Sequence, residues 1–291
     1  IGEGQGIIST TDFFTPVTDD AYDFGRIASA NAISDVFAMG GRPLMAISVL
    51  GWPLEKLPEE EARKVLQGAR AICHEAMIPL AGGHSIDSLE PFFGLAVTGL
   101  VSLNQLKRND TAESGCSLYL TKPLGIGILT TAEKNGMLRD EHRNIARDLM
   151  VRLNDVGALM AGIKEVKAMT DVTGFGLLGH LMEMCEGSGL DAFLYRDDVP
   201  VIPEAVTYAE AGAIPGGTRR NWNSYGHKVK GADDAMRAIL CDPQTNGGLL
   251  IAVTPSGTEI VEGLLRSQGL GVHCIGKMLP RGSGELRISV S

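Results

Sequence analysis

Four aspartates stand beside glycine or hydroxyl residues at the expected ends of strands and helices. They are Asp12, Asp35, Asp171 and Asp242. A carboxylate in such a place would repel a bare phosphate, but Mg²⁺ takes oxygen ligands from one or two carboxylates together with phosphate oxygens. The recurrence of this arrangement predicts a site for a metal ion and a polyphosphate more strongly than any one of the acids does.

The stretch 168–180, AMTDVTGFGLLGH, combines one of these acids with two glycines. An apolar run ends at Asp171, then Gly174 and Gly176 follow, and a periodic apolar run begins at Leu177. A strand, a glycine turn and a helix in this order suit an anion, because glycines let the backbone approach it and the first N–H groups of a helix face negative charge. An Asx-type turn that caps the helix is the alternative, and the motif alone leaves both interpretations open.

Two other segments carry polar groups that could serve the same site. The expected helix 24–39 holds Asn31 and Asp35 four residues apart, so both project from one face. A buried pair without partners would be costly, and a solvent-facing pair near the helix end is the alternative. Residues 82–85 (GGHS) are expected to form a second glycine turn whose N–H groups, imidazole and hydroxyl suit phosphate oxygens. An exposed tight turn is the more common explanation of that motif.

Composition and charge narrow the classes of partner. The 291 residues are 44% apolar and 21% charged, which is ordinary for one large or two smaller globular domains. A net charge of −9 without a Lys/Arg-rich run disfavours nucleic acid and anionic membrane as partners. The cysteines are scattered without a CxxC pair, which disfavours a zinc site or a disulfide framework and indicates reduced thiols. Because no signal peptide or bilayer-long apolar run is visible, we expect a cytoplasmic protein.

Strands and helices alternate in both halves of the chain, which predicts an α+β (α/β-like) class with two domains. The composition turns polar at residues 107–115, and we take this stretch as the boundary. The expected domains are therefore residues 1–108 and residues 109–291.

Three segments of the second half have clear local patterns. Apolar residues recur with a helical period through residues 145–163, which predicts one long amphipathic helix. Residues 199–206 read as pieces of strand, and residues 215–221 (PGGTRRN) read as a glycine loop with two cations. A polar segment, residues 241–248 (CDPQTNGG), precedes the expected strand 249–253.

Seven segments follow one another between Ile8 and about Val253: STTDFFTP, RIASANAISDVFAMGG, LAGGHSID, LTKPLGIG, AMTDVTGFGLLGHL, PGGTRRN and CDPQTNGGLL. In type, order and spacing they resemble the selenide, water dikinase (selenophosphate synthetase) family. That family shares a superfamily with aminoimidazole ribonucleotide synthetase, thiamine monophosphate kinase and a hydrogenase maturation factor. The resemblance implies a two-domain aminoimidazole ribonucleotide synthetase-like fold, whose N-terminal domain binds ATP and pairs in a dimer.

The resemblance also implies a reaction in which ATP, selenide and water give selenophosphate, AMP and orthophosphate, with Mg²⁺ as cofactor. Asp12 and Asp35 would contact the nucleotide. Asp35 and Asp171 would ligate magnesium ions that bridge the phosphates, and we expect their carboxylates to converge although they come from different domains.

Further roles follow from the same resemblance. Gly83, His84 and Ser85 would contact ATP that is bound mainly to the partner subunit of a homodimer, and residues 216–221 would lie near the phosphate end. The expected strands of the first domain give a separate reason to predict a homodimer. They carry more apolar surface than two helices on one face would cover, and pairing with a second copy would bury it.

The chain departs from the family at its start. The family carries, upstream of the TTD strand, a glycine-rich segment with a reactive Cys or selenocysteine and a Lys, followed by an Asp-Asp pair. None of this precedes Ile1 here, so we expect the N-terminal segment to be missing and the catalytic nucleophile to lie upstream. We expect the chain as given to fold without making selenophosphate, and Cys241 in its acidic surroundings to be a structural thiol.

Two alternatives remain. The chain could be a nucleotide-binding paralogue that has lost selenide chemistry, or a sister ATP-dependent ligase or kinase of the superfamily. The residues upstream of Ile1 would separate the first alternative from the enzyme. The joint fit of TDVTGFGLLGHL, GGTRRN and CDPQTNGGLL disfavours the second.

Overall fold

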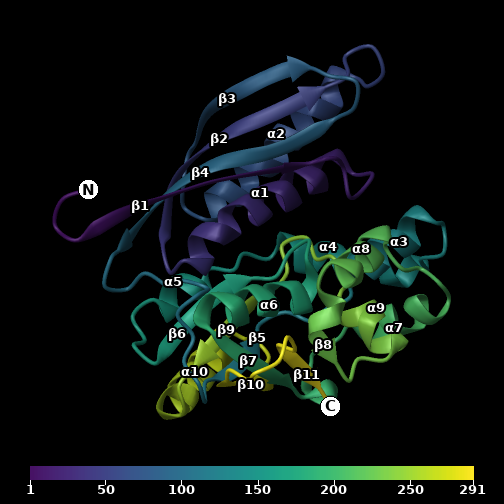
Figure 1. Cartoon of the computed structure of the whole chain (residues 1–291). Coiled ribbons are helices and arrows are strands. Elements are labelled where there is room, and N and C mark those ends of the chain that lie inside the picture. The colour runs from purple at the N-terminus through teal and green to yellow at the C-terminus, as the bar shows by residue number, and fades with distance from the viewer. The chain divides into compact units, whose positions relative to one another are not determined.

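The computed structural model describes residues 1–291 and divides them into two compact units (Figure 1). Unit 1 comprises Ile1–Leu106 with Met150–Ala158, and unit 2 comprises Lys107–Leu149 with Leu159–Ser291. The first change of unit falls within two residues of the boundary expected at 108. No composition signal marks the return of Met150–Ala158 to unit 1, because that segment has an ordinary helical pattern.

Unit 1 is a four-stranded sheet with two helices against one of its faces (Figure 1). The strands lie in the order β1-β4-β2-β3, and only the β2–β3 pair is parallel. The strands and helices are β1 (Gln5–Phe14), α1 (Ala21–Ala38), β2 (Arg42–Trp52), α2 (Glu59–Glu75), β3 (Leu80–Asp87) and β4 (Phe92–Ser102).

Two glycines set the distance between α1 and α2. A Cβ added at Gly25 of α1 would lie 1.9 Å from the carbonyl oxygen of Val65, and one at Gly68 of α2 would lie 2.0 Å from that of Tyr22. The backbones therefore approach more closely than any other residue allows. This approach packs α1, with its buried small residues, directly against α2.

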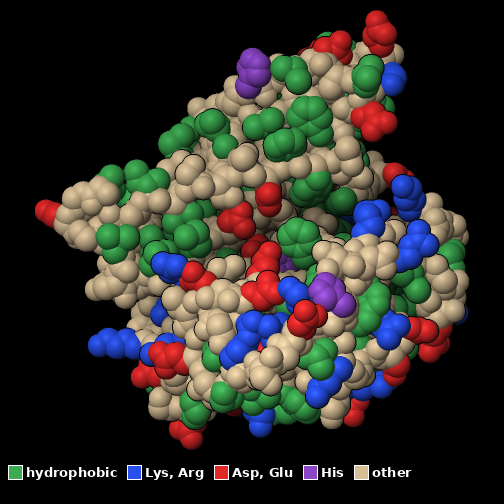
Figure 2. Space-filling model, viewed as in Figure 1, with side chains coloured by type: hydrophobic (Ala, Val, Ile, Leu, Met, Phe, Trp, Pro, Cys, Tyr) green, Lys and Arg blue, Asp and Glu red, His purple; other side chains and the backbone are tan.

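The opposite face of the sheet is open and carries large apolar side chains. Side chains alternate along a strand, so Ile8 is buried under the helices at 4% exposure while Ile7 and Phe13 on the open face are each 55% exposed. Met45 and Ile47 of β2 continue this face at 38% and 42%. Figure 2 shows hydrophobic side chains gathered over the strands of unit 1. The two helices thus cover one face only.

Unit 2 is built on a seven-stranded sheet in the order β6-β9-β5-β10-β7-β11-β8. Its strands are β5 (Ser117–Leu120), β6 (Val166–Asp171), β7 (Leu190–Leu194), β8 (Val229–Lys230), β9 (Leu249–Val253), β10 (Cys274–Pro280) and β11 (Ile288–Val290). The remaining helices are α3 (Ile126–Lys134), α4 (Arg143–Val151), α5 (Val156–Met160), α6 (Gly176–Ser188), α7 (Pro203–Glu210), α8 (Gly216–Tyr225), α9 (Asp234–Leu240) and α10 (Thr258–Ser267). Every residue of β9 is buried, which makes that strand the centre of the core.

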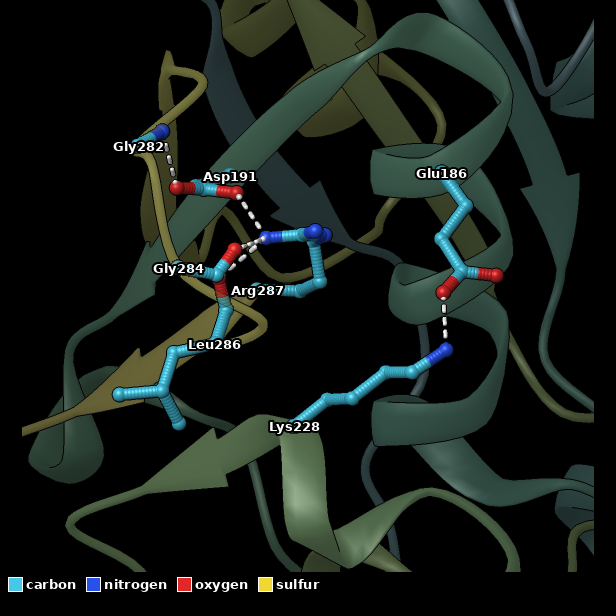
Figure 3. Close-up of polar contacts among 7 residues, drawn as sticks. All are labelled: Glu186, Asp191, Lys228, Gly282, Gly284, Leu286 and Arg287. Carbon is cyan, nitrogen blue, oxygen red and sulfur yellow. Dashed lines mark hydrogen bonds and ion pairs between the residues drawn. The ribbon is translucent and has the colours of Figure 1, made fainter.

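A buried arginine fixes the C-terminal segment of unit 2 (Figure 3). Arg287, 9% exposed, donates from Nη1 to the carbonyl oxygens of Gly284 at 2.8 Å and Leu286 at 2.7 Å. The same nitrogen lies 3.5 Å from Oδ1 of Asp191 on β7, and Asp191 Oδ2 accepts from the N–H of Gly282 at 2.8 Å. The loop before β11 is therefore tied to the strand beside which β11 pairs.

Two local predictions for the second half are wrong. The helix expected over 145–163 is broken between α4 and α5. There the Asn154 side chain donates to Ser34 Oγ of α1 at 2.9 Å, which ties the loop to α1, and the backbone carbonyl of Asn154 accepts from Gly157 N at 2.9 Å in a new turn that leads into α5. Of the strand pieces expected at 199–206, only Val201 pairs, in one isolated parallel bridge with Leu124. From Pro203 on the segment is α7 instead, because proline suits the first position of a helix.

Gly68→Ala is expected to destabilise unit 1 by about 1–3 kcal/mol, because the new methyl overpacks the α1–α2 contact. The matched control is Gly263→Ala in α10, where nothing lies within 4 Å of the added Cβ. That variant should stabilise the protein by roughly 0.5–1 kcal/mol through helix propensity. Urea unfolding measures both. Equal stability of Gly68→Ala and the parent would contradict the close approach.

Candidate functional site

Two of the predicted acids meet between β1 and α1. Asn31 Nδ2 donates to Asp12 Oδ2 at 2.7 Å, and the Thr10 hydroxyl donates to Asp35 Oδ2. Asn31 is 6% exposed. The i,i+4 pair on α1 therefore faces β1, and the solvent-facing alternative is wrong. Both donors are neutral groups that help to orient the two carboxylates.

The GGHS segment lies in a strand, so the turn expected at 82–85 is wrong. It belongs to the edge strand β3, where Gly83 pairs with Ser48 of β2 and both His84 and Ser85 are exposed. The φ of Gly83 is +156°, and a Cβ there would lie 2.1 Å from Ser48 Oγ. The glycine thus serves close strand pairing, while the outer edge of β3 stays open.

The two predicted nucleotide contacts of unit 1 lie at opposite edges of one sheet. β1 carries Asp12, β3 carries Gly83, His84 and Ser85, and β4 and β2 lie between them. Three interstrand spacings amount to about 14 Å. One copy of unit 1 therefore does not bring these two groups of residues together.

The AMTDVTGFG segment forms the expected strand, glycine turn and helix in unit 2. β6 ends at Asp171, which is 6% exposed, and α6 begins at Gly176, whose φ is +70°. Gly174 and Phe175 between them are exposed. His180 of α6 reaches back, and its Nε2 accepts from the N–H of Thr173 at 3.0 Å. A strand-end acid and an exposed glycine turn therefore stand next to each other.

Four of the recognised segments converge behind this turn. The turn's carbonyls accept from Asn221 Nδ2, at 2.9 Å to Gly174, and from Gln244 N, at 3.0 Å to Thr173. Lys122 of the LTKPLGIG segment, 2% exposed, donates from Nζ to the carbonyl oxygen of Asn246 at 2.8 Å. Residues 215–221, expected as a glycine loop, begin α8, because Pro215 caps a helix that the two glycines continue.

Asp242 is buried at 0% exposure and binds backbone rather than lining a surface. Its Oδ2 accepts from Gly127 N at 3.0 Å, at the start of α3, and from Gln244 Nε2 at 2.7 Å. Its Oδ1 has no partner. Burial raises the pKa of the Asp242 carboxyl to about 7, against the opposing effect of these hydrogen bonds. Burial therefore contradicts the expectation that Asp242 joins the other three acids in a site for a metal ion and a polyphosphate.

The cysteines are free, and four of the five are buried. Burial raises the pKa of the Cys241 thiol to about 11, so this thiol is protonated at neutral pH and fills space in the core. Within either unit no group of three or more His, Cys, Asp or Glu side chains gathers as a metal site. None of the helices combines the length and apolar character needed to cross a bilayer.

Sequence reasoning missed the roles of Asn221, Gln244 and Lys122. Each is at most 8% exposed and bonds the backbone of another segment. Their only signal was that a polar residue stood in a recognised segment beside apolar runs. The partners lie up to 124 residues away in the chain, so local spacing could not identify them.

Asp242→Asn should flatten the pH dependence of stability. The carboxyl's folded pKa is raised above 3.8, so the folded state holds the extra proton, and its stability falls as pH rises from about 4 to about 7. Between about pH 5 and about pH 8 the parent should lose on the order of 1–3 kcal/mol more than the variant. Urea unfolding across this range measures the difference. The exposed Asp234→Asn is the control, and parallel profiles for parent and Asp242→Asn would refute the prediction.

Family models match the chain on both sides of the unit boundary. The AIR synthase related protein, N-terminal domain, matches residues 1–101, and the corresponding C-terminal domain matches residues 113–289. The chain is 58% identical over 288 residues to the selenide, water dikinase of Pseudomonas putida, covering 99% of this chain and 84% of that protein. It is 55% identical over 291 residues to that of Photorhabdus laumondii, covering 100% and 84%.

Solved structures share the fold at lower identity. A thiamine-monophosphate kinase from Stenotrophomonas maltophilia aligns with a TM-score of 0.76 at 20% identity, covering 100% of this chain and 87% of that chain. The hydrogenase maturation protein HypE in complex with ATP aligns at 0.73 and 18%, covering 95% and 78%. At these identities the likeness concerns the fold, which is the predicted two-domain aminoimidazole ribonucleotide synthetase-like arrangement of helices and sheets.

Proposed function

The chain belongs to the selenide, water dikinase family, and we propose that it makes selenophosphate at a nucleotide site completed by a second copy of itself. Relatives more than 50% identical over nearly the whole chain carry that name, and this observation carries the function. The protein is thus an enzyme, a phosphotransferase with ATP as substrate. Selenide is the second substrate, and AMP and orthophosphate are the other products.

The two alternatives are less well supported. If the chain were a sister kinase or ligase, we would expect high sequence identity to proteins of that kind. The thiamine-monophosphate kinase and HypE structures are only 17–20% identical to this chain. The relatives from Pseudomonas putida and Haemophilus influenzae, at 58% and 52% identity, are both named selenide, water dikinase, which does not favour a paralogue without selenide chemistry. We place the reaction in the cytoplasm, where free thiols such as these stay reduced.

Asp35 in unit 1 and Asp171 in unit 2 are the residues that we propose as ligands of Mg²⁺, with Asp12 at the nucleotide. The residues fit the ion in kind: carboxylate oxygens are ligands that Mg²⁺ takes, and Thr10 and Asn31 orient the carboxylates of unit 1 through neutral hydrogen bonds. Asp171 ends a strand beside the exposed Gly174 and Phe175. Mg²⁺ commonly uses one or two carboxylates and completes its shell with phosphate oxygens and water. When bound, it would neutralise phosphate charge during transfer.

A homodimer is the second part of the proposal. Gly83, His84 and Ser85 lie on the sheet edge opposite Asp12, and this separation favours a nucleotide held between the sheets of two copies. The open face of unit 1 suits pairing with its own copy through large apolar side chains such as Ile7 and Ile47. Two-fold pairing of identical patches is the common way to bury such a face.

Asp171→Asn should weaken magnesium-dependent ATP binding by about tenfold or more, because a charged ligand is lost. Selenide-dependent AMP release by the full-length gene product should fall with it. Calorimetric titration of ATP at several Mg²⁺ concentrations measures the binding effect. The exposed Asp198→Asn makes the same charge change in unit 2 and should leave binding unchanged. Parent-like Mg²⁺ dependence in Asp171→Asn would remove Asp171 from the site.

Ile47→Lys should convert the dimer to a monomer at micromolar concentration, because it places a charge in the centre of the open face. Ile260→Lys is the matched control, since Ile260 is 53% exposed on α10 and far along the chain from that face. Sedimentation velocity separates the two states. A parent protein that sediments as a monomer, or a dimeric Ile47→Lys, would contradict pairing through this face.

A further inference from the structure

α8 presents two buried donors to the turn that follows Asp171. Asn221 and Tyr225 stand four residues apart on one face of the helix, and each is 8% exposed. Asn221 Nδ2 donates to the carbonyl oxygens of Gly174 at 2.9 Å and Cys241 at 3.0 Å. These two bonds use both hydrogens of the amide, so Asn221 has no hydrogen left to donate to a ligand.

Tyr225 bonds the next carbonyl of the turn, that of Phe175. Its hydroxyl donates to the carbonyl oxygen of Phe175 at 2.6 Å. Burial raises the pKa of the Tyr225 phenol, so the hydroxyl remains a donor at physiological pH. Gly179 of α6 makes room for the ring, because a Cβ there would lie 3.1 Å from Tyr225 Cε1. A larger residue at Gly179 would push the ring away from the turn.

These bonds also decide where the N–H groups of the turn point. In a trans peptide the C=O and the N–H of the next residue point in opposite directions, and no cis peptide occurs here. Gln244 holds the Thr173 carbonyl inward and Asn221 holds that of Gly174, so the N–H groups of Gly174 and Phe175 point outward. Gly174 and Phe175 are exposed, and none of the turn's hydrogen bonds uses these N–H groups.

We propose that Asn221 and Tyr225 are positioning residues that hold the turn so that the N–H groups of Gly174 and Phe175, beside Asp171, face a phosphate of the bound nucleotide. This inference rests on the proposed function, in which Asp171 ligates Mg²⁺ and MgATP is the substrate. It revises the role expected for residues 216–221, since Asn221 acts through the turn rather than on the phosphate itself.

The alternative is that α8 contributes only packing. Two buried donors on two successive carbonyls of an exposed turn are more than packing requires, because an apolar side chain at either position would bury more favourably. The turn has few other contacts of its own, since Gly174 has no side chain and Phe175 is 56% exposed. Its geometry therefore depends on the groups that hold its carbonyls.

The test compares two tyrosine variants that lose the same atom. Tyr225→Phe removes the hydroxyl that holds Phe175. Tyr208→Phe removes another largely buried hydroxyl of unit 2, which accepts from Arg139 N at 3.0 Å and lies 2.8 Å from His142 Nδ1, away from the turn. Asn221→Ala removes both bonds of the amide, and Asp171→Asn serves as the reference for the metal site.

The primary readout is the Mg²⁺ concentration that half-saturates ATP binding, measured by titration calorimetry on protein shown to be folded by circular dichroism. Asn221→Ala should raise this concentration about tenfold and Tyr225→Phe about threefold, as the loss of two and one neutral hydrogen bonds predicts. Tyr208→Phe should shift it by less than about twofold, although its Tm falls as much as that of Tyr225→Phe. Combined with Asp171→Asn, Asn221→Ala should add no further shift.

Each outcome separates the inference from the function on which it rests. If Tyr225→Phe and Tyr208→Phe have the same Mg²⁺ dependence, α8 acts through stability alone and the inference is overturned. Should Asn221→Ala fail to fold, Tyr225→Phe still decides the question. A parent-like Mg²⁺ dependence of Asp171→Asn would instead overturn the metal assignment of the proposed function.

Discussion

The four-stranded sheet of unit 1 keeps its two edges apart, and the proposed nucleotide site depends on that separation. β1 and β3 are divided by two strands, and each ladder of hydrogen bonds keeps its spacing of roughly 4.8 Å. No local rearrangement can bring Asp12 to His84 without breaking a ladder. In the proposed dimer a nucleotide lies between Asp12 of one copy and His84 of the other, and the open face of the sheet carries the apolar side chains on which a second copy can pack.

The aspartates of this protein differ in the groups that form hydrogen bonds or ion pairs with their carboxylates. Asp12 and Asp35 accept from an amide and a hydroxyl at the contact between β1 and α1. Asp191 lies against the buried guanidinium of Arg287, and this pair ties the loop before β11 to β7 (Figure 3). Asp242 is bonded by backbone and Gln244 deep in unit 2, and its raised pKa reflects burial. The surroundings of each carboxylate, rather than its position at the end of an element, therefore separate Asp191 and Asp242 from the acids of the proposed site.

Backbone direction gives unit 2 its polar surface beside Asp171. Two side chains and one amide hold the inner carbonyls of the turn, and planar trans peptides then turn the neighbouring N–H groups toward solvent. The polar residues of α8 and of the CDPQTNGG segment thus act on a ligand through the backbone. Holding the carbonyls of the turn in this way needs donors from several segments, which explains why α8 and the CDPQTNGG segment meet behind the turn.

The sequence by itself determined the class of fold, the family and most elements that hold the site, because strand and helix periods and glycine positions are local properties. The strand to Asp171, the turn and α6 were predictable in this way, as was α1 with Asn31 and Asp35 on one face. Only the tertiary structure decided that GGHS is an edge strand, that PGGTRRN begins a helix, and that Asp242 is buried. In each case the deciding contact joins residues far apart in the chain: Gly83 with Ser48, Asn221 with Gly174, and Asp242 with Gly127. Local spacing contains no information on such contacts, since they depend on which buried backbone groups need partners once the sheets have formed.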